Sequence, residues 1–138
     1  MRHPQLLVCD REGGLGDALR ELARQRRWFF RVRRQPESCL RFLRRGNPGV
    51  LVLRLGGDLF GRSLERELKL LDRVAWLFPD TAALVVCAVN HAALIGLAWD
   101  LGARYVLLPA QPREGLSEIA AGLMQAVLQS ASLQQAPS

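Results

Sequence analysis

The charged residues that could carry chemistry follow short apolar runs of the chain. Asp10, Arg11 and Glu12 come directly after one run, and Arg54 stands near the end of another. Carboxylates in such places can ligate a metal ion or exchange protons, whereas a guanidinium group has five donors and no acceptor. Arg54 can therefore neither ligate a cation nor accept a phosphoryl group, but it can bind a carboxylate through two parallel hydrogen bonds.

The other polar motifs give no catalytic constellation. The Gly-rich segment 13–16 matches neither the G-x-G-x-x-G pattern nor a P-loop, so we interpret it as a strand-to-helix turn. Asp58 is interpreted as a loop residue, and His91 as an exposed residue in the first turn of a helix. No Ser-His-Asp or Cys-His pairing can be argued, and we predict no enzyme activity.

The three cysteines are too few and too scattered for a disulfide framework or a zinc site. We expect Cys9, Cys39 and Cys87 to be small buried hydrophobic residues. No metal ion and no cofactor is predicted.

The bulk composition is that of a globular protein. The 138 residues are 49% hydrophobic and 23% charged, which suits a single domain at 1–128 followed by a short flexible tail at 129–138. No apolar run approaches the ~18–20 residues that span a bilayer. The N-terminal residues do not resemble a secretory signal. The sequence therefore predicts a cytoplasmic protein.

Strand and helix patterns alternate along the whole chain. Apolar runs predict strands at 6–9, 28–34, 50–53, 82–87 and 105–108. Helical spacing predicts helices at 15–27, 37–45, 63–78, 90–102 and 113–128, with Ser63 and Asn90 as candidate N-caps. This alternation predicts an α/β domain with a doubly wound five-stranded parallel sheet, a flavodoxin-like (βα)5 fold with strand order 2-1-3-4-5. Ligands of such folds bind at the carboxyl ends of the strands.

Several stretches in this order and spacing resemble a response-regulator receiver domain (CheY-like) over about residues 5–128. They are Leu6-Leu-Val-Cys-Asp10, Pro48-Gly-Val-Leu-Val-Leu-Arg-Leu55, Val85-Val-Cys-Ala88, Ala98-Trp-Asp-Leu-Gly-Ala103 and Tyr105-Val-Leu-Leu-Pro109. The resemblance implies a signalling module that takes up a phosphoryl group on a carboxylate at the end of the third strand. It also implies two acids after the first strand that hold magnesium.

This sequence departs from the chemistry of that family at each position. Arg54 stands where the family has its acceptor carboxylate, and Arg11 replaces the second acid after Asp10. The family ends its fourth strand with a hydroxyl residue and its fifth with a lysine before proline.

At those two positions this chain has Cys87, and Leu108 before Pro109. These departures predict a pseudo-receiver that binds no magnesium and cannot be phosphorylated at position 54. Its function would then be protein interaction in a two-component or phosphorelay-like system.

The same departures suggest what fills the vacated pocket. We expect Arg54 and Arg11 to pair with Asp10 and Glu12. The acidic pocket would then be a permanent structural network that needs neither phosphate nor metal.

Basic residues are concentrated in the first third of the chain. Residues 1–50 hold 12 arginines and five acids, whereas 51–138 are close to neutral. We expect the first helix, the edge strand and the second helix to gather many of these arginines on one side: Arg24, Arg26, Arg27, Arg31, Arg33, Arg34, Arg41, Arg44 and Arg45. Such a patch is either a solvated face or a site for nucleic acid, an acidic protein or another anionic ligand. A basic adaptor is therefore the alternative function.

The predicted fourth helix at 90–102 is apolar nearly all round. A helix on one face of a sheet should be polar on its outer side, so this composition favours a covered surface, with an unusually apolar helix that has no partner as the alternative. Receiver domains commonly pair through this helix, the fifth strand and the last helix. The resemblance therefore implies a homodimer or a protein partner there, with Ile95, Trp99 and Tyr105 as candidate contacts.

Overall fold

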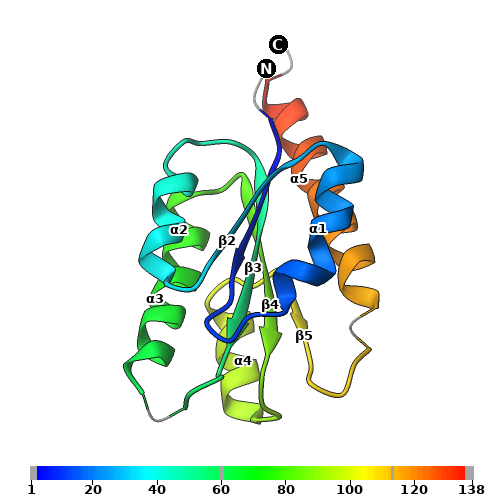
Figure 1. Ribbon diagram of the computed structural model, residues 1–138. Coiled ribbons are helices and arrows are strands. Elements are labelled where there is room, and N and C mark those ends of the chain that lie inside the picture. Colours follow the sequence, from blue (N-terminus) through cyan, green and yellow to red (C-terminus); the bar gives the residue numbers. More distant parts are fainter. Residues whose placement is uncertain (1–2, 60, 113, 136–138) are drawn as a thin grey trace.

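The structure is a computed structural model that describes residues 3–59, 61–112 and 114–135. Strands and helices alternate along the chain, and the helices cover both faces of one parallel sheet (Figure 1). The strands are β1 (Gln5–Cys9), β2 (Phe29–Arg33), β3 (Gly49–Leu55), β4 (Thr81–Cys87) and β5 (Tyr105–Leu107). The helices are α1 (Leu15–Arg26), α2 (Pro36–Leu43), α3 (Arg62–Leu77), α4 (Ala92–Asp100) and α5 (Gly115–Gln135). The strand order is β2-β1-β3-β4-β5, so the predicted flavodoxin-like fold is confirmed.

The register of the central strands sets the position of the charged residues. Strands β1, β3 and β4 are buried along their whole length, as expected for parallel strands covered on both faces. Cys9 at the end of β1 lies opposite Leu53 of β3. The next residues along the two strands, Asp10 and Arg54, are therefore neighbours at the carboxyl edge of the sheet.

Each face of the sheet has its own apolar core. Strand residues such as Leu51 and Leu53 pack against α2, α3 and α4, whereas Val8 and Val52 pack against α1 and α5. Asp10 and Arg54 continue the alternation of Val8 and Val52. Both therefore point to the face that α1 and α5 cover, and Figure 1 shows these two helices together on one side of the sheet.

The two predicted N-caps are wrong by one or two residues. Helix α3 has Gly61 at its N-cap position, and Ser63 lies inside the first turn, where its hydroxyl group accepts a hydrogen bond from Arg11. Helix α4 is capped by His91 instead of Asn90, because Nδ1 of the exposed imidazole accepts a hydrogen bond from the backbone N–H of Leu94 at 3.2 Å.

Helix α5 continues beyond the predicted end at residue 128. The stretch from 129 to Gln135, which the sequence placed in a flexible tail, is helical in the structure. Residues 129–135 are Gln, Ser, Ala and Leu, with neither Gly nor Pro, so nothing in them interrupts the helix. Residues 136–138 lie outside the described residues. Among the described residues, no helix is both long enough and apolar enough to cross a membrane.

Candidate functional site

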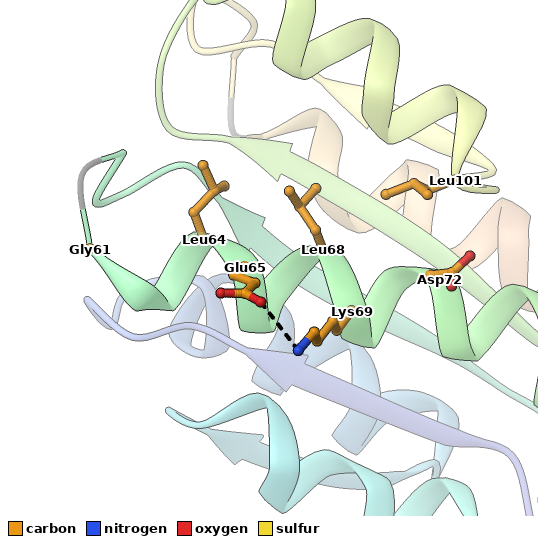
Figure 2. A pocket seen from close by; sticks show the side chains of 7 residues that line it. All are labelled: Gly61, Leu64, Glu65, Leu68, Lys69, Asp72 and Leu101. Carbon is orange, nitrogen blue, oxygen red and sulfur yellow. Dashed lines mark ion pairs between the residues drawn. The ribbon is translucent and has the colours of Figure 1, made fainter.

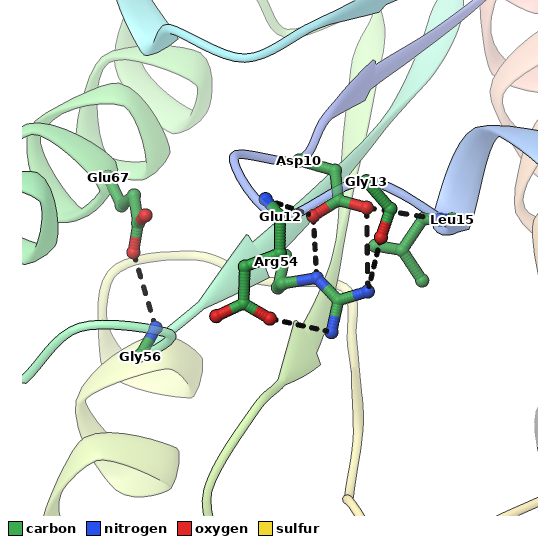
Figure 3. A network of polar contacts seen from close by, with 7 residues as sticks. All are labelled: Asp10, Glu12, Gly13, Leu15, Arg54, Gly56 and Glu67. Atoms are coloured by element: carbon green, nitrogen blue, oxygen red, sulfur yellow. Dashed lines mark hydrogen bonds and ion pairs between the residues drawn. The ribbon is translucent and has the colours of Figure 1, made fainter.

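Arg54 and Asp10 form a buried ion pair at the carboxyl edge of the sheet (Figure 3). The Nε atom of Arg54 donates to Oδ1 of Asp10 at 2.6 Å, and a terminal nitrogen of Arg54 donates to Oδ2 at 3.4 Å. The Asp10 side chain is 0% exposed and that of Arg54 only 8%. This part of the predicted network is confirmed, and it is the two-bond geometry that a guanidinium fork favours.

Asp10 has no lone pair left for a metal ion. Its Oδ1 also accepts from the backbone N–H of Glu12 at 3.1 Å, and its Oδ2 from that of Leu15 at 3.0 Å. An ionised carboxylate offers about four acceptor positions, and here four donors occupy them. Binding a cation would therefore require breaking hydrogen bonds inside a buried site.

The turn between β1 and α1 completes the shell around Arg54. The carbonyl oxygen of Gly13 accepts from a terminal nitrogen of Arg54 at 3.2 Å. Gly13 and Gly14 have φ angles of +88° and +104°, a conformation that favours glycine. The predicted strand-to-helix turn therefore also supplies an acceptor to the guanidinium group. On the outer side, a carboxylate oxygen of Glu12 lies 3.9 Å from the remaining terminal nitrogen of Arg54.

The environment of Asp10 keeps this carboxyl group ionised. Burial by itself would raise its pKa, but hydrogen bonds from Arg54 and from the Leu15 N–H outweigh that cost and hold the pKa below its ordinary value. The pair is thus a permanent charge pair at neutral pH.

A polar cavity of about 300 Å³ lies beside this pair. It is lined by Arg11, Glu12, Arg54, Gly57, Asp58 and Glu67. Glu67 of α3 is buried and accepts from the backbone N–H of Gly56 at 3.2 Å (Figure 3). Burial raises the pKa of Glu67 to about 7, and the carboxylates of Asp58 and Glu12 add to the rise, while the Gly56 N–H and Arg11 oppose it. Glu67 is therefore a buried acid that titrates near neutral pH.

Sequence reasoning did not single out Glu67, although its helical spacing indicates that it is buried. Glu67 shares the inward stripe of α3 with Leu70, Leu71 and Val74, at intervals of three, four and seven residues. An acidic residue on the apolar stripe of an amphipathic helix indicates a buried carboxylate.

Arg11 does not take the position that the sequence predicted for it. It pairs with Asp58 at 3.5 Å and donates to the hydroxyl group of Ser63, instead of pairing with Asp10 or Glu12. The reason is that Asp10 is already saturated by Arg54 and two backbone groups. Arg11 is half exposed and spans the cavity mouth, from the β1–α1 loop to the start of α3.

Three further residues were predicted for the pocket. Cys87, Leu108 and Pro109 are absent from the residues that line the described cavity. Cys87 is buried at the end of β4, and burial raises the pKa of its thiol, which leaves it unreactive. Leu108 is 37% exposed. Among the described residues, no three His, Cys, Asp or Glu side chains are grouped to hold a metal ion.

Comparison with known proteins gives matches among solved structures alone, since no family model and no curated protein matches the sequence. A response regulator from Thermotoga maritima is 21% identical, with a TM-score of 0.70 over 89% of this chain and 98% of that one. A signal receiver domain from Vibrio parahaemolyticus is 16% identical, with a TM-score of 0.74 over 99% and 100%. A response regulator from Burkholderia pseudomallei with a phosphorylated aspartic acid and a calcium ion is 21% identical, with a TM-score of 0.63 over 97% and 75%.

The chain has the fold of a response-regulator receiver domain. The matches agree with the resemblance drawn from the sequence, and at identities of 16% and 21% they establish the fold. Within this receiver fold, the Arg54–Asp10 pair lies at the carboxyl ends of β1 and β3, where the resemblance places the phosphorylation chemistry of the family.

The α4 side of the receiver fold exposes apolar side chains. Leu97 and Trp99 are 39% and 47% exposed, and Ile95 is half-buried. The rings of Trp99 and Tyr105 pack edge to face, with centroids 6.3 Å apart, so the end of α4 is joined to the free edge of β5. The three residues predicted as contacts thus belong to two adjacent elements.

A second apolar surface lies between α3 and α4 and was not anticipated from the sequence. Figure 2 shows Leu64 and Leu68 of α3 pointing into a hollow that Leu101 closes on the α4 side. Its volume is about 480 Å³, and a neighbouring hollow of about 470 Å³ shares Leu64 and Leu68 and adds Leu94 and Leu97. Leucine side chains thus line a groove along α3.

The arginine-rich segment is divided between the two faces of the receiver fold. Arg24 and Arg26 belong to α1, whereas Arg41 belongs to α2 on the opposite face. Strand β2 at the edge of the sheet lies between these two groups, and the single patch stays a prediction. The arginines of β2 and of the end of α2 do share a surface, since Arg33 and Arg45 both lie over the ring of Phe42.

Proposed function

We propose that the chain is a non-phosphorylatable pseudo-receiver that acts as a protein-interaction module in cytoplasmic signal transduction, and not as an enzyme. The observation that carries the proposal is Arg54, which stands at the position of the family's acceptor carboxylate and binds Asp10 through two hydrogen bonds.

Phosphoryl transfer needs an acceptor and a divalent cation to offset developing charge. The similar response regulator from Burkholderia pseudomallei carries a phosphorylated aspartic acid and a calcium ion. In this chain Arg54 has no lone pair to attack phosphorus, and the acceptor positions of Asp10 are taken. The cation that the site has is its own guanidinium group, which cannot leave. The interaction state of the domain would therefore not depend on phosphate.

Incubation with acetyl phosphate and magnesium tests the first half of the proposal. We expect intact-mass spectrometry to find no added phosphoryl group, and thermal melting to be unchanged by magnesium with beryllium fluoride. A phosphorylatable receiver domain in the same assay shows that the reagents are active. A phosphoryl adduct on any carboxylate of the cavity would refute the proposal.

The interaction surface that we propose consists of α4, β5 and α5, and its occupant is a second copy or another protein. Trp99 supports this choice, because it is an exposed aromatic side chain held against Tyr105 at the edge of the sheet. Large aromatic side chains on a rigid element are typical anchors of protein interfaces.

Sedimentation equilibrium of the wild type, Trp99→Glu and Trp76→Glu at low and high salt tests this surface. Trp76 of α3 is 79% exposed, so its variant matches the change in charge and size at a different place. We expect a dimer that persists in high salt, is lost in Trp99→Glu and is kept in Trp76→Glu. A wild type that is monomeric throughout would exclude the homodimer, and a dimer that Trp99→Glu leaves intact would exclude this surface.

A second candidate function is that of a basic adaptor for an anionic ligand. The observation that favours it is the group of arginines on β2 and at the end of α2, which lie over aromatic rings. The two functions use different edges of the sheet and do not exclude each other.

A further inference from the structure

Three arginines cover two phenylalanine rings at the β2 edge of the sheet. The guanidinium carbon of Arg31 lies 4.2 Å from the centroid of Phe29, and that of Arg33 lies 5.0 Å from Phe42. The guanidinium carbon of Arg45 lies 5.8 Å from the centroid of Phe29 and 5.2 Å from that of Phe42, and the two ring centroids are 5.9 Å apart. Cation–π contacts of this kind hold the guanidinium groups against the rings before any ligand arrives. We call these five residues the arginine edge.

Two of these arginines also close the free side of β2. The backbone groups of Phe29 and Arg33 bond toward β1, so the carbonyl groups of the alternate residues Phe30 and Val32 face outward. Arg31 donates to the Phe30 oxygen at 2.8 Å, and Arg33 to the Val32 oxygen at 3.0 Å. A partner strand would have to displace both side chains, so the arginine edge disfavours a partner that binds by adding a strand to the sheet.

Most of the positive charge of residues 24–45 is not neutralised within the described residues, although Arg24 pairs with Glu21 at 2.6 Å. Residues 24–45 hold nine arginines and one acid, Glu37, which gives a local charge of +8. Glu37 lies 3.5 Å from Arg66 of α3. In the described residues, the ion pairs within 4.0 Å include none made by Arg31, Arg33 or Arg45. These guanidinium groups therefore keep donors available to an external anion.

The surroundings of the arginine edge distinguish between classes of anionic partner. Protein interfaces depend on exposed apolar or aromatic anchors, whereas nucleic-acid interfaces are polar and strongly positive. The large hydrophobic side chains that the described surface exposes lie elsewhere, on α3, on α4 and after β5: Trp76, Leu77, Leu97, Trp99 and Leu108. Phe42 is 5% exposed. The arginine edge thus has the charge of a nucleic-acid surface without the anchors of a protein one.

We propose that the arginine edge binds the phosphate backbone of nucleic acid without reading base sequence. The inference deepens the second candidate function and is independent of whether the domain can be phosphorylated. Guanidinium groups bind phosphate through two N–H groups, and their planes can stack on unpaired bases. Contacts from guanidinium groups to phosphate position a protein on nucleic acid but carry no sequence information, so we expect binding without base preference.

Fluorescence anisotropy with a labelled mixed-sequence DNA duplex and a labelled single strand measures this binding. The variants are Arg31→Gln and Arg45→Gln, and the control is Arg104→Gln, which removes the same charge from an exposed residue next to β5 at the opposite edge of the sheet. We expect wild-type binding that weakens steeply with salt. Each test variant should lower the slope of log K against log salt by about 0.9 and the affinity at 0.1 M salt about five- to tenfold. Circular dichroism confirms that the variants are folded.

The inference would be overturned if Arg104→Gln lost as much affinity for DNA as the two test variants. The net charge of the protein alone would then account for the binding. Polyglutamate serves as a second probe. Binding of polyglutamate without binding of nucleic acid would also overturn the inference but leave the basic adaptor in place, whereas binding of neither would remove both. None of these outcomes affects the acetyl phosphate test, because that test probes the Arg54–Asp10 pair, which is not made by side chains of the arginine edge.

Discussion

Two buried carboxylates at the carboxyl edge of the sheet are stabilised in opposite ways. Asp10 accepts four hydrogen bonds, two from the Arg54 guanidinium group and two from backbone N–H groups, and its pKa lies below the ordinary value. Glu67, on the other side of the cavity, accepts one backbone hydrogen bond from Gly56, and its pKa rises to about 7. The difference shows that burial alone does not decide whether a carboxylate is charged, since the number of donors aimed at it does.

The contrast extends to the effect of pH. Asp10 binds a proton more weakly in the folded state than in the unfolded chain. It therefore stabilises the fold at pH values above its unfolded pKa, and this contribution is lost as the pH falls through its folded pKa. Glu67 behaves in the reverse way. Its contribution is present below the unfolded value of 4.5 and declines as the pH rises toward 7.

The largest expected effect is that of Arg54→Met. This change removes the partner of a carboxylate with 0% exposure, so we expect the free energy of unfolding at pH 7 to fall by about 3–5 kcal/mol. Urea denaturation followed by circular dichroism measures it. The double variant Asp10→Asn/Arg54→Met should recover part of the loss, because it removes the unpaired charge. A loss below about 1 kcal/mol in the single variant would mean that the pair is not what stabilises Asp10.

An intermediate effect is expected for Glu67→Gln, and it should depend on pH. Glutamine keeps an acceptor for the Gly56 N–H but removes the buried charge. At pH 8 the variant should therefore be more stable than the wild type by on the order of 2 kcal/mol, and near pH 5 the difference should largely disappear. Urea denaturation at both pH values measures this. Parallel pH profiles for the two proteins would show that Glu67 does not titrate in this range.

The smallest effect is expected for Glu12→Gln, which serves as the matched control for Glu67→Gln. The Glu12 side chain lines the same cavity but is 53% exposed, and it lies 3.9 Å from Arg54. A solvent-exposed pair of this kind contributes at most about 0.5 kcal/mol. The same urea titrations should therefore place this variant within that margin of the wild type at pH 5 and pH 8. A larger change would indicate that Glu12, and not Asp10 alone, holds Arg54 in place.

The strands and their order could be predicted from the sequence, because alternation of apolar runs with amphipathic helices permits few arrangements. The Arg54–Asp10 pair was also predictable, since both residues directly extend neighbouring strands whose register is fixed. Helix caps were less accessible: Ser63 and Asn90 have suitable side chains, but Gly61 and His91 take the cap positions. Local chemistry allows several adjacent residues to cap, and packing of the helix decides among them.

The partner of Arg11 and the burial of Glu67 depend on how α3 is placed against the β1–α1 loop. Loop residues have no periodicity from which such a placement could be inferred, so the sequence indicated acids and arginines near one another without assigning the pairs. The helical spacing of Glu67 with Leu70, Leu71 and Val74 was the one available indication.

The buried Arg54–Asp10 pair also limits how this sequence can change in evolution. A single substitution of Arg54 by aspartate would add a negative charge beside Asp10, Glu12 and Glu67 and remove the cation that balances them. Such an intermediate would lose stability because its negative charges are not balanced. It would gain no phosphate chemistry in return, since that would require several substitutions together. A single substitution is therefore not sufficient to turn this site into a phosphate-responsive pocket.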